Sequence, residues 1–313
     1  EAIMTEAGKP RQFAQGEVQR GTHTFGLAAD LCRTLHGEML PTDLRAGLEG
    51  RRGLVQRYPI GPVLGITPFN FPLNLVAHKL APALLAGCPI ILKPASGTPV
   101  TALKLGEIML EAGLPPAALS ILPHSSKHSH TLVQDARIKL LSFTGGIEVG
   151  WQLKEQAGKK KVALELGGDA AAIVLQDADL AHAAKRCALG AFAYSGQVCI
   201  SVQRIIVQED VAAAFTEQFL QEVQQAKLGD PTDGETLVGP MIDQENAERI
   251  ATWVQEATEG GAEVLHGGTG AYQQGGGWWH PLTVLRGVPE DAMLRNDEAF
   301  GPVVEIIPVK DAE

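Results

Sequence analysis

The sequence is poor in cysteine. Only Cys32, Cys88, Cys187 and Cys199 occur in 313 residues, and no two of them form a C-x-x-C pair. Four thiols in a chain of this length exclude a disulfide scaffold and favour a reducing compartment, so we expect a cytoplasmic protein. The histidines between residues 124 and 130 have no carboxylate or cysteine at ligand spacing, so we expect no metal site.

Positive charge and long apolar runs are also scarce. Lysine and arginine number 26 against 36 aspartates and glutamates, which gives a formal charge of −10. The longest basic run is Lys159–Lys161, so we expect neither nucleic acid nor an acidic membrane surface as a partner. No signal peptide and no membrane-spanning apolar run is visible. The first residues, Glu1–Met4, do not resemble a native start, which suggests a piece of a longer protein.

Apolar residues are abundant enough for a sizeable core. They make up 45% of the chain against 20% charged residues, and the length predicts two domains. From Gly61 onward short apolar strands alternate with helices, a pattern that indicates right-handed βαβ units around a parallel sheet. We therefore predict an α/β fold: a Rossmann-like doubly wound parallel sheet. The predicted strands are 62–67, 88–92, 119–122, 138–143 and 161–166, and the helices are 71–87, 99–113, 127–134 and 147–157.

Two further regions flank this alternating pattern. Residues 1–35 predict two helical stretches, and 37–58, rich in glycine and arginine, predict a protruding hairpin. After residue 170 a second α/β unit begins. Its predicted strands are 170–175 and 204–207, and its predicted helices are 179–193, 211–227 and 244–260.

Polar residues follow several of the predicted strands, at the edge where ligands bind in doubly wound sheets. Asn70 lies in a proline-stiffened loop, where it either presents its amide or caps the next helix. Lys93 either pairs with ribose or phosphate or is a solvated charge. Gly145 and Gly146 open a helix whose bare amides suit a phosphate, although a lone glycine pair is weak evidence.

Two candidate reactive residues remain ambiguous from their local sequence. Glu165 lies in an apolar strand, where it forms a structural ion pair or acts as a general base with a raised pKa. Cys199 lies in small, apolar surroundings between a helical run and a strand. Its thiol is either a core side chain or a nucleophile held at a turn, and spacing alone favours the core.

Taken together, four motifs favour the nucleophile interpretation of Cys199. They are P-F-N-F-P around Asn70, L-E-L-G-G around Glu165, G-Q-V-C ending at Cys199 with Arg204 beyond it, and E-A-F-G-P-V at Glu298–Val303. In order and approximate spacing they resemble the NAD(P)-dependent aldehyde dehydrogenase superfamily. Each motif is moderately specific, but all four in order on an α/β background are very specific. The resemblance extends from near residue 1 to the end of the chain.

The resemblance implies an oxidoreductase that converts an aldehyde to a carboxylic acid. Cys199 is then the nucleophile that forms a thiohemiacetal, with the Asn70 amide and the Cys199 N–H as oxyanion hole. Hydride transfer to the nicotinamide leaves a thioester, which water activated by Glu165 hydrolyses. Two alternatives remain: a CoA-acylating relative, which the presence of Glu165 disfavours, and an inactive truncated fragment that only binds nucleotide.

The resemblance also implies a cofactor site for NAD or NADP. Lys93 and Ser96 would face the adenosine ribose, and NADP is accepted because serine replaces a glutamate that in many NAD-preferring members repels the 2′-phosphate. The implied cofactor contacts are Ile66, Thr67, Phe69, Lys93, Ser96, Gly145, Gly146, Leu166, Glu298 and Phe300.

The resemblance finally implies a domain arrangement. Residues 1–36 and 59–167 would form the NAD(P)-binding domain, 37–58 an oligomerisation hairpin, and 168–313 a catalytic domain that is incomplete at its C-terminus. Family chains extend beyond both ends of this sequence. We therefore expect a truncated chain whose full-length parent is a homo-oligomer acting on a small-molecule aldehyde.

Overall fold

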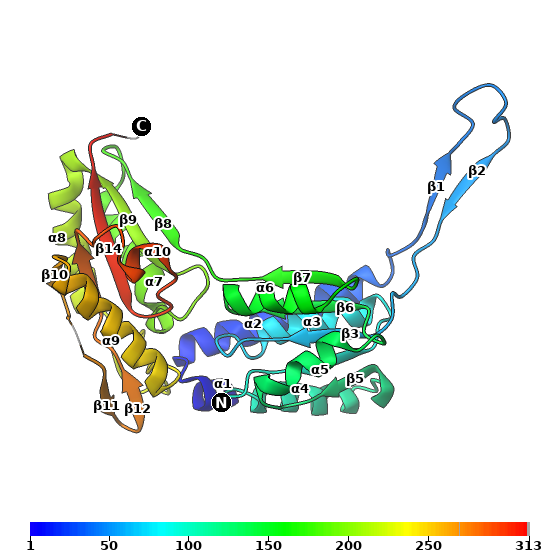
Figure 1. The fold of residues 1–313 in the computed structure, drawn as a ribbon, viewed down its shortest axis with the longest axis horizontal. Coiled ribbons are helices and arrows are strands. Elements are labelled where there is room, and N and C mark those ends of the chain that lie inside the picture. Colours follow the sequence, from blue (N-terminus) through cyan, green and yellow to red (C-terminus); the bar gives the residue numbers. More distant parts are fainter. Residues whose placement is uncertain (269, 312–313) are drawn as a thin grey trace. The chain divides into compact units, whose positions relative to one another are not determined.

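A computed structural model describes residues 1–268 and 270–311, apart from the side chain of Ser126. The chain divides into two compact units, each described by itself below (Figure 1). The first unit comprises Glu17–Glu165, and the second joins Glu1–Gly16 to Leu166–Glu313. Each contains a five-stranded sheet with flanking helices. The α/β fold class predicted from the alternation of strands and helices is therefore confirmed.

The sheet of the first unit is wholly parallel and has the strand order β5-β4-β3-β6-β7. Its strands are β3 (Val63–Ile66), β4 (Ile90–Lys93), β5 (Leu119–Ile121), β6 (Leu140–Thr144) and β7 (Lys161–Glu165). Its helices are α3 (Asn74–Leu85), α4 (Val100–Glu111), α5 (Ser129–Gln134) and α6 (Ile147–Gln156), with short 3-10 turns η1 (Pro116–Ala118) and η2 (Ser126–His128).

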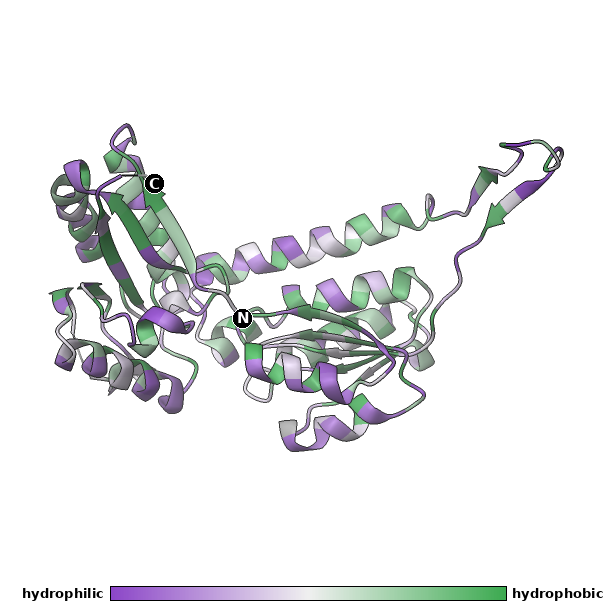
Figure 2. Cartoon of the chain, turned by 45° about the horizontal axis from the view of Figure 1, so that its top comes forward, coloured by the Kyte–Doolittle hydropathy of each residue, from purple (hydrophilic) through white to green (hydrophobic). Residues whose placement is uncertain are grey.

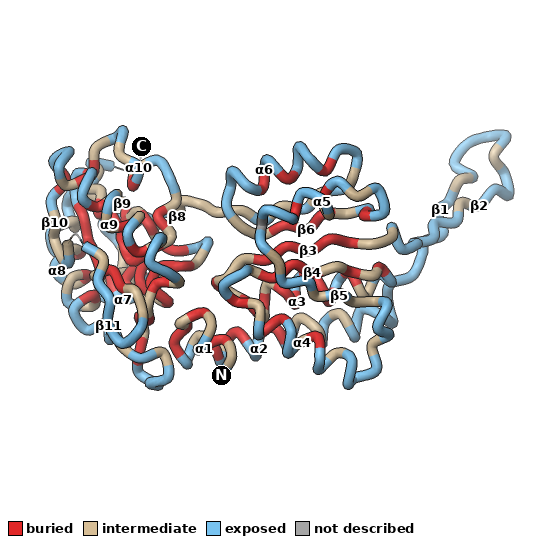
Figure 3. The backbone as a smooth tube through the Cα atoms, turned by 60° about the horizontal axis from the view of Figure 1, so that its bottom comes forward, coloured by how far each residue is buried: buried red, intermediate tan, exposed pale blue. Residues whose placement is uncertain are grey.

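Burial explains why these runs become central strands. Every residue of β3 is buried, because this strand lies in the middle of the sheet with helices on both faces. Figure 3 shows α5 and α6 on one side of the strands and α3 and α4 on the other. Leu80 of α3 and Leu92 of β4 are fully buried in the core between helix and sheet. The edge strand β7 has no fully buried residue.

The strand order contains a topological switch point between the neighbouring strands β3 and β6. From β3 the chain proceeds through β4 to β5, and it then returns to place β6 on the other side of β3. Ligands of doubly wound sheets bind at the carboxyl ends of the strands at such a switch point. The loops after β3 and β6 begin with Thr67 and Gly145, so two of the predicted cofactor contacts occupy this position.

The predicted hairpin is present. Strands β1 (Glu38–Pro41) and β2 (Arg52–Val55) pair antiparallel, with Glu38 opposite Val55. The hairpin follows α2 (Arg11–Leu31) and extends away from the sheet of the first unit (Figure 1).

The second unit is built on the sheet order β10-β13-β14-β9-β8, in which only the edge strand β10 is antiparallel. Figure 2 shows hydrophobic residues concentrated in these strands and alternating with polar ones on the outer helices. The strands are β8 (Ala170–Val174), β9 (Val202–Gln208), β10 (Glu263–His266), β13 (Thr283–Arg286) and β14 (Val303–Val309), with the hairpin β11 (Tyr272–Gln274) and β12 (Gly277–Trp279). The helices are α7 (Leu180–Phe192), η3 (Ala193–Gly196), α8 (Glu209–Gln225), α9 (Gln244–Glu259) and α10 (Met293–Asn296).

The first helix, α1 (Ala2–Ala7), packs with the second unit, whereas the sequence grouped residues 1–36 with the Rossmann-like sheet. Contacts across the chain explain the difference. The Tyr194 hydroxyl donates a hydrogen bond to the Ala7 carbonyl (2.9 Å), and a Cβ on Gly8 would lie 2.8 Å from Pro240 Cγ. The second boundary, at Glu165, lies close to the expected one at 167.

Candidate functional site

Cys199 follows an unusual backbone turn in the second unit. Tyr194, Ser195 and Gly196 have φ angles of 53°, 58° and 66°, so three successive residues adopt the left-handed conformation. For residues with a side chain this conformation costs about 1 to 2 kcal/mol each. The Cys199 side chain is exposed after this turn, whereas Cys88 and Cys187 are buried.

Hydrogen bonds from distant segments hold the turn in place. Tyr194 N–H donates to the Leu237 carbonyl (3.2 Å), and Ser195 Oγ donates to the Gly239 carbonyl (2.5 Å). The Gln197 side chain donates to the Pro240 carbonyl (3.3 Å) and accepts from the Ile242 N–H (2.9 Å). Strain of this kind persists only where the surroundings over-determine the backbone, and it concentrates at functional sites.

The loop at Glu298 lies against the same turn. A Cβ on Gly196 would approach the Gly301 carbonyl oxygen to 2.2 Å, so only glycine permits this contact. Phe300 has a φ of 49° and is the third non-glycine residue with a positive φ among those described, after Tyr194 and Ser195. All three therefore lie in the segments around Cys199 and Glu298, which carry predicted site residues of this unit.

Glu298 rests on the glycine pair that follows β7. Its Oε1 accepts the Gly168 N–H (3.2 Å), and a Cβ on Gly167 would lie 1.9 Å from its Oε2. Burial raises the pKa of Glu298, and the Gly168 hydrogen bond and Arg249 oppose this rise. The half-buried Leu166 precedes these glycines. Gly168 is in turn close to Cys199, since a Cβ on Gly168 would lie 3.8 Å from the Cys199 carbonyl oxygen.

Asn70 and Glu165 belong to the first unit. Asn70 is buried in the loop between β3 and α3. The helix begins at Asn74, not at Phe71 as the capping alternative required, and Glu17 accepts hydrogen bonds from the Leu73 and Asn74 N–H groups (2.8 and 3.0 Å). The capping interpretation of Asn70 therefore loses its basis.

Glu165 is the last residue of β7 and is exposed, whereas its apolar neighbours in the sequence predicted a buried carboxylate. Residues of the edge strand β7 alternate between exposed and half-buried, and Glu165 is one of the exposed residues. Its backbone carbonyl accepts the Gly145 N–H (3.1 Å), which ties the end of β7 to the glycine pair.

Sequence analysis did not predict a role for Lys79, a buried lysine on α3. Its Nζ donates to Ser142 Oγ (3.0 Å) and Thr144 Oγ1 (2.9 Å), and Thr144 pairs with Glu165 in the sheet. Burial lowers the pKa of Lys79 to about 8, and the charge of Glu165 acts in the opposite direction. The sequence pattern could have predicted that Lys79 is buried, because this lysine occurs three residues after Val76 on the apolar face of α3.

The predicted nucleotide contacts lie at the ends of neighbouring strands. Ile66 and Lys93 are the last residues of β3 and β4 and face each other in the sheet. Both are buried, and burial lowers the pKa of Lys93. Thr67 is also buried, and its hydroxyl has no hydrogen-bond partner among the described residues. Ser96 is exposed, and its Oγ donates to the His124 carbonyl (3.4 Å).

The helix α6 begins directly after Gly146, which adopts an extended conformation at its N-cap. A Cβ on Gly145 would lie 2.6 Å from Phe143 Cζ, whereas nothing lies within 4 Å of one on Gly146. Free backbone N–H groups and the helix dipole favour a phosphate at such a position. With the partnerless Thr67 hydroxyl and the buried Lys93 ammonium at the same sheet edge, these residues fit a nucleotide. Phe69 is half-buried beside them, and its carbonyl accepts the Thr98 hydroxyl (3.5 Å).

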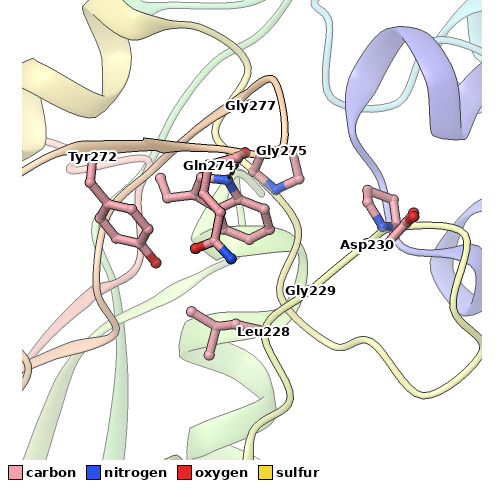
Figure 4. Close-up of a pocket in the computed structure, with 10 residues that line it drawn as sticks. Leu228, Gly229, Asp230, Tyr272, Gln274, Gly275 and Gly277 are labelled. Atoms are coloured by element: carbon pink, nitrogen blue, oxygen red, sulfur yellow. Dashed lines mark hydrogen bonds between the residues drawn. The ribbon is translucent and has the colours of Figure 1, made fainter.

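The described residues show no membrane-spanning helix and no metal cluster, and the cavity described below contains no predicted site residue. None of the helices described could cross a membrane, and no group of three potential metal ligands occurs in the described part of the chain. A cavity of about 370 Å³ in the second unit is bounded by Leu228 on one side and by Tyr272 and Gln274 on the other (Figure 4). No predicted site residue lines it.

The fold and its strand-end glycines define a class of nucleotide-binding α/β proteins, and comparison identifies the family. A family model described as "Aldehyde dehydrogenase family" matches residues 1–313, and the chain belongs to this family. It is 41% identical over 307 residues to the 3-sulfolactaldehyde dehydrogenase of Priestia aryabhattai, covering 98% of this chain and 63% of that protein.

Two solved structures show the same likeness. Aldehyde dehydrogenase 21 from Physcomitrella patens, in complex with the reaction product succinate, matches with a TM-score of 0.93 and 43% identity over 99% of this chain and 64% of that one. The NADP-dependent glyceraldehyde-3-phosphate dehydrogenase of Bacillus halodurans, complexed with NADP, matches with a TM-score of 0.92 and 38% identity over 99% and 64%. The chain thus spans less than two thirds of the length of these relatives.

Proposed function

We propose that the protein containing this chain oxidises a small aldehyde to its carboxylic acid with NAD or NADP. The observation that carries the proposal is that Cys199 is exposed and follows the left-handed turn Tyr194–Gly196. The chain that contains this cysteine belongs to the aldehyde dehydrogenase family. Accessibility and a fixed backbone are what a nucleophilic thiol requires, and a core thiol requires neither.

In this proposal the chemistry begins at sulfur. The Cys199 thiolate attacks the aldehyde carbon, a C–S bond forms, and the carbonyl oxygen becomes an alkoxide. The Asn70 side-chain amide and the Cys199 N–H donate hydrogen bonds to that oxygen. Such donors matter most where charge develops, and losing one costs roughly 10² to 10³ in rate.

A bound nicotinamide would supply the hydride acceptor that oxidation of the thiohemiacetal to a thioester requires. The chain's own residues would bind and orient this cofactor. Gly145 and Gly146 would approach the pyrophosphate, Lys93 and Thr67 would provide polar groups at the strand ends, and Glu298 would bind the nicotinamide ribose. Ser96 carries no negative charge, so NADP is accepted as well as NAD.

Hydrolysis of the resulting thioester is assigned to Glu165. Its carboxylate takes a proton from water, the water oxygen attacks the acyl carbon, and the Cys199 thiolate leaves as the acid forms. The exposed position of Glu165 at the end of β7 gives water direct access to this carboxylate.

The test uses the full-length protein that contains residues 1–313. Wild type, Cys199→Ser and Glu165→Gln are assayed with NAD and with NADP against 3-sulfolactaldehyde, succinate semialdehyde and a neutral aldehyde. We expect Cys199→Ser to lower the rate by roughly 10³ or more. Glu165→Gln should give one burst of reduced cofactor and then stall as an acyl enzyme.

Cys32→Ser is the matched control, because Cys32 is the other exposed thiol. It should retain wild-type activity. Acyl transfer to coenzyme A that survives Glu165→Gln would identify the CoA-acylating alternative instead. No reduced cofactor with any aldehyde would contradict the proposed oxidation, and strict rejection of NADP would contradict the interpretation of Ser96.

A further inference from the structure

A buried glutamine occupies a core position in β9. Gln203, Ile205 and Val207 alternate along the buried face of this strand, and Gln203 is the polar member. Burying an amide without hydrogen bonds costs about 1 to 3 kcal/mol. A glutamine at this position is therefore tolerated only if both ends of its amide find partners.

Both ends of the Gln203 amide contact backbone groups of distant segments. Nε2 donates to the Gly168 carbonyl (2.8 Å), and Oε1 accepts the Ala299 N–H (2.6 Å). Gly168 directly follows β7 and Ala299 directly follows Glu298. One side chain thus fixes the spacing between two loops that carry predicted cofactor contacts.

Glu298 closes these hydrogen bonds into a ring. Its carboxylate accepts the Gly168 N–H (3.2 Å), so Gly168 is held through its N–H by Glu298 and through its carbonyl by Gln203. Arg249 adds a fourth bond by donating to the Ala299 carbonyl (2.8 Å). The next residue, Phe300, has a strained φ of 49°, which the loop maintains only while its neighbours are fixed.

We propose that Gln203 is a positioning residue for cofactor binding. It holds the Glu298–Phe300 loop against Gly168 so that the Glu298 carboxylate is preorganised for the ribose hydroxyls of NAD or NADP. This inference rests on the proposed role of Glu298 in cofactor binding. Gln203 itself is buried behind the loop and acts through Ala299 and Gly168, and preorganisation improves affinity by reducing the ordering cost of binding.

The chemistry of the amide explains which substitutions interrupt the ring. Leucine preserves much of the volume but removes both hydrogen bonds. Glutamate retains an acceptor for the Ala299 N–H and loses the donor to the Gly168 carbonyl. Asparagine keeps both groups on a side chain one methylene shorter, which cannot span the two loops as they stand.

The test compares Gln203→Leu and Gln203→Glu with the control Gln12→Leu in the full-length protein. Gln12 is matched because its Nε2 also joins distant segments of the second unit, donating to the Thr236 carbonyl (2.9 Å). Three quantities are measured: the Kd for NADP and for NAD, the alkylation rate of Cys199 without cofactor, and hydrogen exchange of peptides covering 166–169 and 297–302.

We expect Gln203→Leu to raise both Kd values about tenfold and to accelerate exchange in both peptides. Cys199 alkylation should stay within about twofold of wild type, because the turn before Cys199 has its own hydrogen bonds. Gln203→Glu should change both Kd values and the exchange in the same direction, because it lacks the donor to the Gly168 carbonyl. Gln12→Leu should change neither Kd nor exchange in these peptides.

The proposal is overturned if Gln203→Leu lowers Tm while Kd and exchange remain at wild-type values, since the role would then be structural only. If Gln203→Leu does not fold, Gln203→Glu and Gln203→Asn decide between the same two outcomes. If wild type binds no nucleotide, the proposed function fails at its cofactor step, and the exchange data alone judge whether Gln203 fixes the Glu298 loop.

Discussion

His280 is a buried imidazole in the second unit that no proposed step uses. Its Nδ1 is 2.8 Å from the Pro281 carbonyl, and its Nε2 has no hydrogen-bond partner within the described residues. Burial lowers the pKa of His280 from 6.5 to about 4. The folded protein therefore keeps this ring neutral at pH values where the unfolded chain would protonate it.

This shift predicts a loss of stability in acid. Because the folded pKa is the lower one, the unfolded state binds more protons between pH 6.5 and about 4, and stability falls as pH decreases through this window. The slope is about 1.4 kcal/mol per pH unit, and the whole window is worth roughly 3 kcal/mol. Urea unfolding of the second unit, followed by tryptophan fluorescence at several pH values, measures it.

His280→Leu should remove most of this dependence, since leucine neither titrates nor needs a hydrogen-bond partner. The exposed His182, on α7, supplies the control His182→Leu, which should behave as wild type. An unchanged pH slope in His280→Leu would show that other groups cause the acid sensitivity.

At the scale of elements, the turn before Cys199 is constrained both by its backbone conformation and by close packing. Gly196 has a φ of 66° and lies against the backbone of the Glu298–Val303 segment. The turn thus needs glycine for two independent reasons, conformation and space.

Gly196→Ala should destabilise the second unit by about 2 kcal/mol or more, because the new Cβ would lie 2.2 Å from the Gly301 carbonyl oxygen. Thermal unfolding measures the loss, and alkylation of Cys199 should change its rate as the turn shifts. Gly234→Ala is the control in the same unit, because nothing lies within 4 Å of a Cβ there. Equal stability of the two variants would contradict this account of the turn.

At the scale of the whole molecule, the hairpin β1–β2 is exposed over nearly its full length. Leu44 is 82%, Leu54 69% and Tyr58 79% exposed. A two-stranded hairpin without a core is marginal in water, and a cluster of exposed apolar side chains marks an interaction surface. We propose that this hairpin joins copies of the protein.

Replacing residues 38–55 of the full-length protein by a short glycine linker tests this proposal. The ends of the deleted segment are adjacent, since a Cβ on Gly37 would lie 2.0 Å from the Val55 carbonyl oxygen. We expect the mass in sedimentation equilibrium to fall to that of a smaller assembly or a monomer, while nucleotide binding by the first unit persists. Leu103→Lys, at an exposed leucine outside the hairpin, is the control and should leave the mass unchanged. An unchanged mass after removal of the hairpin would refute its role.

Periodicity and turn residues in the sequence predicted most of the fold. Strands such as β3 and β6 are short apolar runs between helices, and local sequence determines such alternation. The motifs around Asn70, Glu165 and Cys199 predicted the family, which the comparisons confirm. The packing of residues 1–16 with the second unit was not predictable, because it depends on contacts such as Tyr194 to Ala7 that join residues far apart in the chain.

By itself, the sequence determined the α/β class, the strand-end positions of Lys93 and Gly145, and the choice of candidate catalytic residues, because these follow from local patterning and side-chain chemistry. Only the tertiary structure decided that Glu165 lies exposed on an edge strand, that Tyr194 and Ser195 are left-handed, and that Gln203 joins Gly168 to Ala299. Those features depend on strand order and on partners brought together from distant parts of the chain, which no local pattern records.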